Sequence, residues 1–155
     1  MNAVIREVID FSRSEAAKNG VSVQTKLASE LPPVQGDRVE LQQVILNLIL
    51  NAVEAMSGVA DGTRSLQIAT RKSEAGEALI SVRDTGMGLP PGVQENLFKA
   101  FFTTKPTGLG LGLSICRSIV ESRGGRLWAS ANSPQGAVFQ FALPSSLSCV
   151  STDRP

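Results

Sequence analysis

Four polar side chains follow one another at helical spacing in a segment that is otherwise apolar. They are Gln43, Asn47, Asn51 and Glu54. Separations of four, four and three residues place them on one face of a helix. Burying an amide without a partner costs about 1–3 kcal/mol. The stripe therefore predicts a bound ligand, a metal ion or ordered water; hydrogen bonds from the amides to neighbouring backbone are the alternative. The apolar residues around the stripe are predicted to be buried and are Val44, Ile45, Leu48, Ile49, Ala52 and Val53.

A second candidate stretch, Asp84-Thr-Gly-Met-Gly88, directly follows a predicted strand. Asp84 ends that strand, so a rigid element carries its carboxylate. Gly86 and Gly88 allow the backbone to turn sharply and to approach a ligand closely. On this stretch alone, an Asx turn capped by Asp84 is the simpler interpretation.

A third stretch, from Thr103 to Ser114, is rich in glycine and opens a predicted helix. Gly108, Gly110 and Gly112 leave backbone N–H groups free at the helix N-terminus, where the dipole favours an anion. Lys105 lies just upstream and can add a full charge to a phosphate site. In a Walker A loop the Lys follows the glycines, whereas Lys105 precedes them, so that loop is excluded. A dinucleotide-binding turn would have to follow a strand, and the segment 101–106 does not lead out of one.

The elements that must position these residues are both helical and extended. Helices are predicted over 3–18, 41–56 and 111–123, and strands over 21–27, 65–71, 78–83, 126–131 and 138–143. Asp37 is expected to cap the second helix, and Glu40 to complete a capping-box-like pair with it. The segment 84–110 is long enough to be a lid or a binding loop. The inner side of the first helix is expected to hold Val4, Ile5, Val8, Ile9 and Phe11.

Composition excludes several classes of function. The chain has 155 residues, a formal net charge of +1 and no His. The charge provides no field for nucleic acid or an anionic membrane, and the lack of His excludes a Ser-His-Asp triad, a Cys-His dyad and a His-ligated zinc site. Cys116 and Cys149 are far apart and are expected to be free thiols in a reducing compartment. With no secretory signal after Met1, a cytoplasmic location without direct membrane contact is expected.

Taken together, the three stretches resemble the ATP-binding domain of the GHKL superfamily and, within it, the sensor histidine kinases. Leu46–Ala55 looks like the N box, Asp84–Gly88 like the G1 box, Leu97–Lys105 like the F box and Gly108–Ile115 like the G2 box. The boxes occur in order and cover roughly residues 37–145. The short lid and Ala52-Val-Glu-Ala55 are most like the nitrogen-regulator and oxygen-sensor kinase branch.

The resemblance implies a two-layer α/β sandwich, in which helices cover one face of a mixed, mostly antiparallel sheet. Residues 1–20 would be a connecting helix from a helical dimerisation domain that the chain lacks. Residues 21–145 would be the ATP-binding catalytic domain, and residues 146–155 a disordered, Ser-rich tail.

The resemblance also assigns roles to residues. Asn51 would coordinate Mg²⁺ through its amide oxygen, which suits an ion that takes few protein ligands. Asp84 would accept a hydrogen bond from the adenine amino group, with Gly86 and Gly88 shaping the turn beside it. Glu54, where many relatives carry a basic residue, would orient a metal-bound water.

Asn47 occupies the position at which hydrolytic relatives carry a Glu base. Since an amide cannot take a proton from water, the chain is expected to transfer phosphate better than it hydrolyses ATP. The residues expected to hold the phosphates are Lys105, Gly108, Leu109, Gly110, Leu111 and Gly112.

The implied activity is transfer of the γ-phosphate of Mg-ATP to a His on a separate helical dimerisation domain, with a response regulator as an indirect partner. Having no His, the chain could not phosphorylate itself in isolation. Two alternatives stay open: a GHKL serine kinase of the anti-sigma type, and a non-catalytic module that binds nucleotide.

Overall fold

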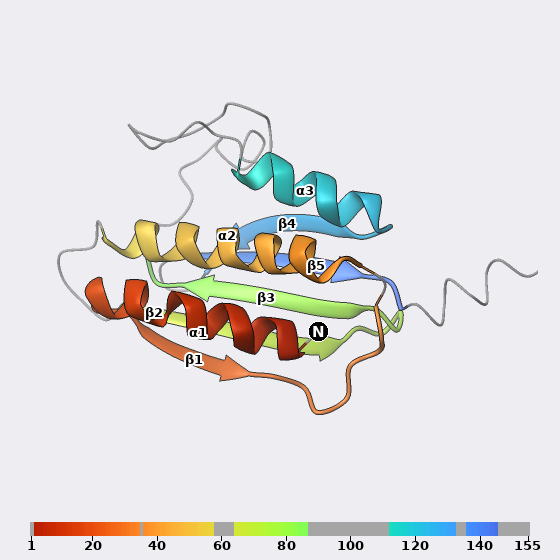
Figure 1. Cartoon of the computed structure of the whole chain (residues 1–155), viewed down its shortest axis with the longest axis horizontal. Helices are drawn as coiled ribbons and strands as arrows, with labels where there is room; N and C mark the ends of the chain where they lie inside the picture. Colours follow the sequence, from red (N-terminus) through yellow and green to blue (C-terminus); the bar gives the residue numbers. More distant parts are fainter. Residues whose placement is uncertain (1, 35, 58–63, 87–111, 133–135, 146–155) are drawn as a thin grey trace, which may run out of the picture.

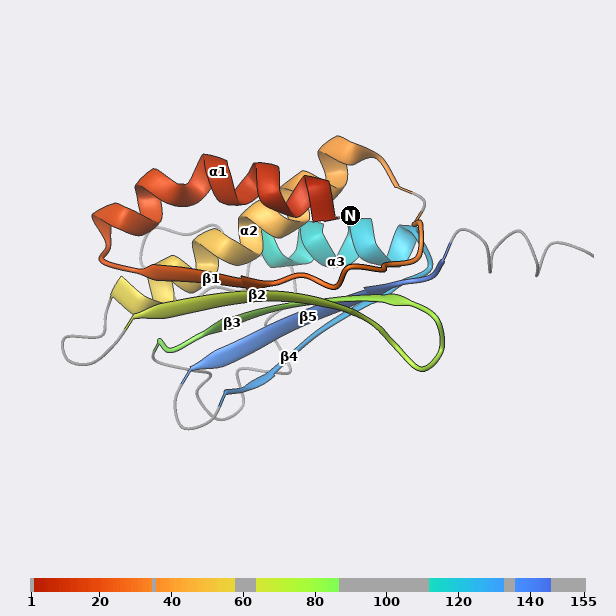
Figure 2. The ribbon, with the colours of Figure 1, turned by 90° about the horizontal axis from the view of Figure 1, so that it is seen from below.

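In the part of the chain that the structure describes, three helices lie over one face of a five-stranded sheet (Figures 1 and 2). The computed structural model describes residues 2–34, 36–57, 64–86, 112–132 and 136–145. Predictions for the 87–111 segment, for Cys149 and for the tail after residue 145 fall outside these residues. The elements are α1 (Asn2–Lys18), β1 (Ser22–Lys26), α2 (Arg38–Ser57), β2 (Ser65–Lys72), β3 (Ala78–Asp84), α3 (Gly112–Ser122), β4 (Arg126–Ala131) and β5 (Ala137–Leu143).

The strand order is β1-β2-β3-β5-β4. Only the edge pair of β1 and β2 is parallel, and the other three pairs are antiparallel. Figure 2 shows all three helices on the same side of the sheet. The predicted two-layer sandwich with a mixed, mostly antiparallel sheet is therefore confirmed.

The core lies between the helices and the sheet, and α2 is its central helix. The six apolar residues predicted around the polar stripe are all buried. In the sheet, the register places Ile80 beside Phe141 and Val82 beside Phe139, and all four are in the core. Among the described helices, none is long and apolar enough to cross a bilayer.

The prediction that Phe11 faces inward is wrong, because its side chain is 79% exposed. Ser12 is buried instead and donates a hydrogen bond of 2.7 Å to the Val8 carbonyl. At 3.6 residues per turn, Phe11 points roughly 100° away from Ser12. The apolar pattern found the inner face through Val4, Ile5, Val8 and Ile9 but placed its edge one residue too far.

Asp37 caps α2 as predicted: its Oδ1 accepts a 2.8 Å hydrogen bond from the Val39 backbone N–H. Glu40 does not complete a capping box. Its carboxylate forms an ion pair with the guanidinium of Arg123, just beyond the end of α3. The competing partner is 83 residues away, so a local capping rule could not have found it.

We predict that the two Phe side chains at opposite extremes of exposure contribute very differently to stability. Phe141→Ala empties a site with 0% exposure and should lower the free energy of unfolding by about 3–5 kcal/mol. Phe11→Ala is the matched control and should change it by less than about 0.5 kcal/mol. Urea denaturation measures both, and similar losses for the two variants would contradict this core.

Candidate functional site

The predicted polar face of α2 is accessible only in part. Gln43 and Glu54 are exposed, whereas Asn47 and Asn51 are half-buried. The Asn47 Nδ2 group donates a hydrogen bond of 3.5 Å to the Cys116 sulfur on α3. Its partner is therefore a thiol, not the neighbouring backbone of the alternative interpretation. Since the side-chain N–H of Asn47 engages α3, the amide oxygen is the group left to act as an acceptor.

Cys116 is a functional neighbour that sequence analysis did not identify. Cys116 is a fully buried free cysteine, in agreement with the predicted free thiol. Its sulfur lies 3.9 Å from the Val44 carbonyl oxygen. The contact with Asn47 joins residues 69 positions apart. Helical spacing places Cys116 on the inner face of α3 but does not reveal its partner.

Asp84 lies at the end of β3 and is only 1% exposed. Its Oδ1 accepts backbone hydrogen bonds from Gly86, at 2.9 Å, and from Ala137, at 3.2 Å. The Gly86 bond is the Asx turn that was the simpler interpretation of this stretch. The Ala137 bond is not local, because it comes from the start of β5.

Burial raises the pKa of Asp84 above its ordinary value, and the N–H groups of Gly86 and Ala137 offset that rise only in part. In the described part of the chain, no Lys or Arg contributes to the shift. A carboxyl group kept in an apolar environment without a cation is costly. Such a group is a candidate for a binding role, in addition to the turn that it caps.

Gly86 brings the Asp84 turn against α2. A Cβ at Gly86 would lie 2.8 Å from the backbone carbon and oxygen of Ala55, so no larger residue fits without a shift. Ala55 is one helical turn beyond Asn51. The next contact is between the Thr85 hydroxyl and the Met56 sulfur, at 3.7 Å. The structure thus brings the predicted N-box helix and the G1 turn together.

The glycine-rich stretch is represented by Gly112 alone, which is exposed and begins α3. Gly112 lies one turn before Cys116, the residue that packs α3 against Asn47. The N-terminus of α3 is therefore close to the Asn47 end of the polar face. The predicted site residues outside the described part are Gly88, Lys105, Gly108, Leu109, Gly110 and Leu111.

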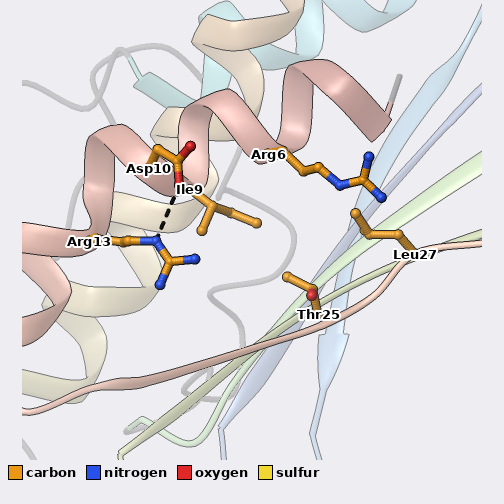
Figure 3. Close-up of a pocket in the computed structure, with 6 residues that line it drawn as sticks. All are labelled: Arg6, Ile9, Asp10, Arg13, Thr25 and Leu27. Atoms are coloured by element: carbon orange, nitrogen blue, oxygen red, sulfur yellow. Dashed lines mark hydrogen bonds and ion pairs between the residues drawn. The ribbon is translucent and has the colours of Figure 1, made fainter.

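A hollow of about 430 Å³ lies elsewhere, between α1 and β1 (Figure 3). Arg13 pairs there with Asp10 at 3.2 Å, on the exposed side of α1. The hollow contains none of the predicted site residues and is lined by Arg6, Ile9, Asp10, Arg13, Thr25 and Leu27. Within the described ranges, no group of three or more His, Cys, Asp or Glu could hold a metal ion.

We predict that Cys116 is unreactive in the folded protein. Burial raises the pKa of its thiol from 9.0 to about 11, which lowers the thiolate fraction at pH 8 roughly 100-fold. In a Cys149→Ser variant, iodoacetamide should label Cys116 of the folded protein at least about 100-fold more slowly than Cys116 of the protein unfolded in denaturant. Equal rates in the two conditions would contradict this burial.

Comparison with known proteins agrees with this geometry. Residues 36–147 match the family described as histidine kinase-, DNA gyrase B-, and HSP90-like ATPase. The sensor protein TdiS of Thauera aromatica is 40% identical over 145 residues, which are 93% of this chain and 26% of that protein. FixL of Bradyrhizobium diazoefficiens is 41% identical over 145 residues, covering 93% and 28%. The chain thus spans about a quarter of the length of these curated relatives.

Solved structures give the same result. The catalytic domain of the histidine kinase ThkA superposes with a TM-score of 0.81 at 34% identity, covering 94% of this chain and 92% of that one. Full-length ShkA gives 0.80 at 29% identity, covering 92% and 29%. A longer ThkA structure gives 0.78 at 32% identity, covering 94% and 40%. The predicted resemblance is confirmed. The chain belongs to the histidine kinase-, DNA gyrase B- and HSP90-like ATPase family, and its fold is that of a histidine kinase catalytic domain.

Proposed function

We propose that this chain binds Mg-ATP and transfers the γ-phosphate to a His on a separate helical dimerisation domain. The observation that carries the proposal is the buried carboxyl of Asp84, which no cation of the described residues pairs with and which is held directly against the α2 helix that bears Asn47 and Asn51. A stability-driven core would replace such a carboxyl with an apolar group. A site that must accept a hydrogen bond from an adenine amino group needs it.

The donor set fits the proposed ligands. Asp84 offers a carboxylate to the base, and the tight approach of Gly86 to Ala55 leaves no room for a side chain at position 86. The amide oxygen of Asn51 is a hard ligand suited to Mg²⁺, which takes few protein ligands and supplements them with water and phosphate oxygens. Lys105 and the 108–112 backbone are proposed to hold the phosphates. The similar ShkA structure is a complex with AMPPNP.

Asn47 is proposed to favour transfer over hydrolysis. Its amide has no basic atom to take a proton from water, and its N–H is engaged by the Cys116 sulfur. Bound Mg²⁺ would supply charge stabilisation at the phosphates. The contribution of the chain is to orient the nucleotide and to exclude a general base from the Asn47 position. Glu54, exposed at the end of the stripe, is proposed to orient a metal-bound water.

The phosphoryl acceptor must come from outside these 155 residues, because they contain no His. We propose residues 1–20 as the connection to the helical acceptor domain and 21–145 as the catalytic domain; the predicted tail, 146–155, lies outside the described residues. A response regulator is the proposed indirect partner, supported by the similar ThkA structure, which is a complex with the response regulator TrrA. A cytoplasmic location remains a prediction. The sensor-kinase relatives favour this function over an anti-sigma-type serine kinase or a non-catalytic module.

The transfer reaction provides a direct test. With γ-labelled ATP and Mg²⁺, the chain alone should gain no phosphohistidine and should release phosphate slowly. A purified helical domain carrying the acceptor His should be labelled in trans. Asn51→Ala should reduce that labelling about 10- to 100-fold, the loss expected for one charge-assisted contact.

Gln43→Ala is the matched control, because it removes an exposed amide from the same stripe two turns earlier and should leave the rate unchanged. Label on a Ser of the partner would replace the proposal with the serine-kinase alternative. Rapid hydrolysis by the chain alone would overturn the role of Asn47, and equal rates for wild type and Asn51→Ala would remove Asn51 from the site.

Asp84→Asn should separate binding from stability. The wild type should bind ATP more tightly than GTP, and the variant should lose that preference, because an amide presents a donor where the base needs an acceptor. Isothermal titration with the two nucleotides measures the ratio. Comparable ATP and GTP affinities in the wild type would contradict base recognition by Asp84.

The same variant should be at least as stable as the wild type at neutral pH. Because the folded-state pKa of Asp84 is raised above 3.8, the folded protein binds the proton more tightly than the unfolded chain does. Wild-type stability from this group is therefore greatest below the unfolded pKa and is lost as pH rises through the folded one. Asp84→Asn should lack this pH dependence in thermal denaturation. A strongly destabilised variant with unchanged ATP binding would make Asp84 a purely structural residue.

A further inference from the structure

The connection between β4 and β5 holds the backbone of Asp84 as well as its side chain. The Asn132 Nδ2 group donates a hydrogen bond of 2.7 Å to the Asp84 carbonyl oxygen. The Ala137 N–H donates to the Asp84 carboxylate from the other end of the same connection. Asp84 is thus held at two points by one hairpin. Asn132 lies 48 residues away in sequence.

Asn132 acts where the regular sheet ladder stops. The pairing of β3 with β5 ends at Arg83 and Val138. One residue further on, the Ala137 N–H bonds to the Asp84 side chain instead of continuing the backbone ladder. The Asn132 amide donates to the Asp84 carbonyl, which would otherwise lack this donor at the end of the strand. This division leaves the Ala137 N–H for the carboxylate.

The hairpin itself is shaped to make this contact. The Asn132 N–H donates a 3.0 Å backbone bond to the Gly136 carbonyl, which fixes the base of the turn. Gly136 has a φ of 110°, and a Cβ there would lie 2.0 Å from the Asp84 carbonyl oxygen. Only glycine permits both this conformation and this approach. The hairpin and the end of β3 therefore form one tightly fitted unit.

We infer that Asn132 is a positioning residue for nucleobase recognition, which fixes the Asp84 carboxylate in the orientation that selects adenine. The inference rests on the proposed function of Asp84. Holding the Asp84 carbonyl fixes the peptide plane that follows it, and so the direction of the Cα–Cβ bond that carries the carboxylate. A carboxylate that turned away from the base would still cap the Gly86 turn. It would no longer discriminate an adenine amino group from a guanine oxygen.

The test compares affinities for ATP and GTP in the wild type and three variants by isothermal titration in Mg²⁺. Asn132→Ala should weaken ATP binding about three- to tenfold, the effect of one neutral hydrogen bond, and leave GTP binding nearly unchanged. Asn19→Ala is the matched control, because Asn19 Nδ2 makes the same kind of bond, at 2.9 Å to the exposed Glu15 carbonyl. It should keep the wild-type ratio. Asn132→Ser retains a hydroxyl donor and should show an intermediate ratio.

The outcomes separate this inference from the proposal beneath it. Unfolding temperatures of the same proteins are measured in parallel, to detect a purely structural role of Asn132. If Asn132→Ala lowers stability while the ATP-to-GTP ratio stays at the wild-type value, the inference is overturned and the proposed function stands. If the wild type itself shows no preference for ATP, base recognition by Asp84 fails and the inference fails with it. Should Asn132→Ala not fold, an unchanged ratio in Asn132→Ser would overturn the inference.

Discussion

The packing of α2 against the sheet is the constraint on which the other features depend. Val44, Ile45, Leu48, Ile49 and Val53 are all buried, and the free energy gained by removing them from water fixes the rotation of the helix. Once that face is committed to the sheet, the remaining face must carry the amides of Asn47 and Asn51. Rotation of α2 by one residue would bury an amide and expose an aliphatic side chain. Core packing and placement of the polar face are therefore one event.

The Asp84 carboxyl shows how the fold tolerates an unfavourable group. Its burial raises its pKa, and two backbone N–H groups compensate only in part. A fold selected for stability alone would have no reason to keep a group whose charged form is disfavoured by its burial. Two glycines pack closely around this group, because no Cβ fits at either position: Gly86 lies against Ala55, and Gly136 lies against the Asp84 carbonyl. The cost and the close fit occur at the same place, as expected for a binding site.

Two side-chain contacts hold α3 against α2. Cys116 links α3 to Asn47, and Arg123, beyond the end of the same helix, pairs with Glu40 in the first turn of α2. α3 is thus attached to α2 at both ends of their contact. Because α3 begins at Gly112, these contacts fix the position of its N-terminus relative to α2.

The sequence by itself determined the local features, which depend on residues close together in the chain. Helical spacing identified the buried and polar faces of α2. Local residue types identified Asp37 as the helix cap and the Asx turn at Asp84, and four ordered boxes identified the family. Tertiary structure decided the partners of those features. Cys116 for Asn47, Arg123 for Glu40 and Asn132 for Asp84 are separated from them by 69, 83 and 48 residues. The exposure of Phe11 was also decided by the tertiary structure, because an apolar residue at the edge of a helical face is buried only if a neighbouring element covers it. Periodicity encodes which face of an element is apolar, whereas the choice of a hydrogen-bond partner depends on which elements the sheet order brings together.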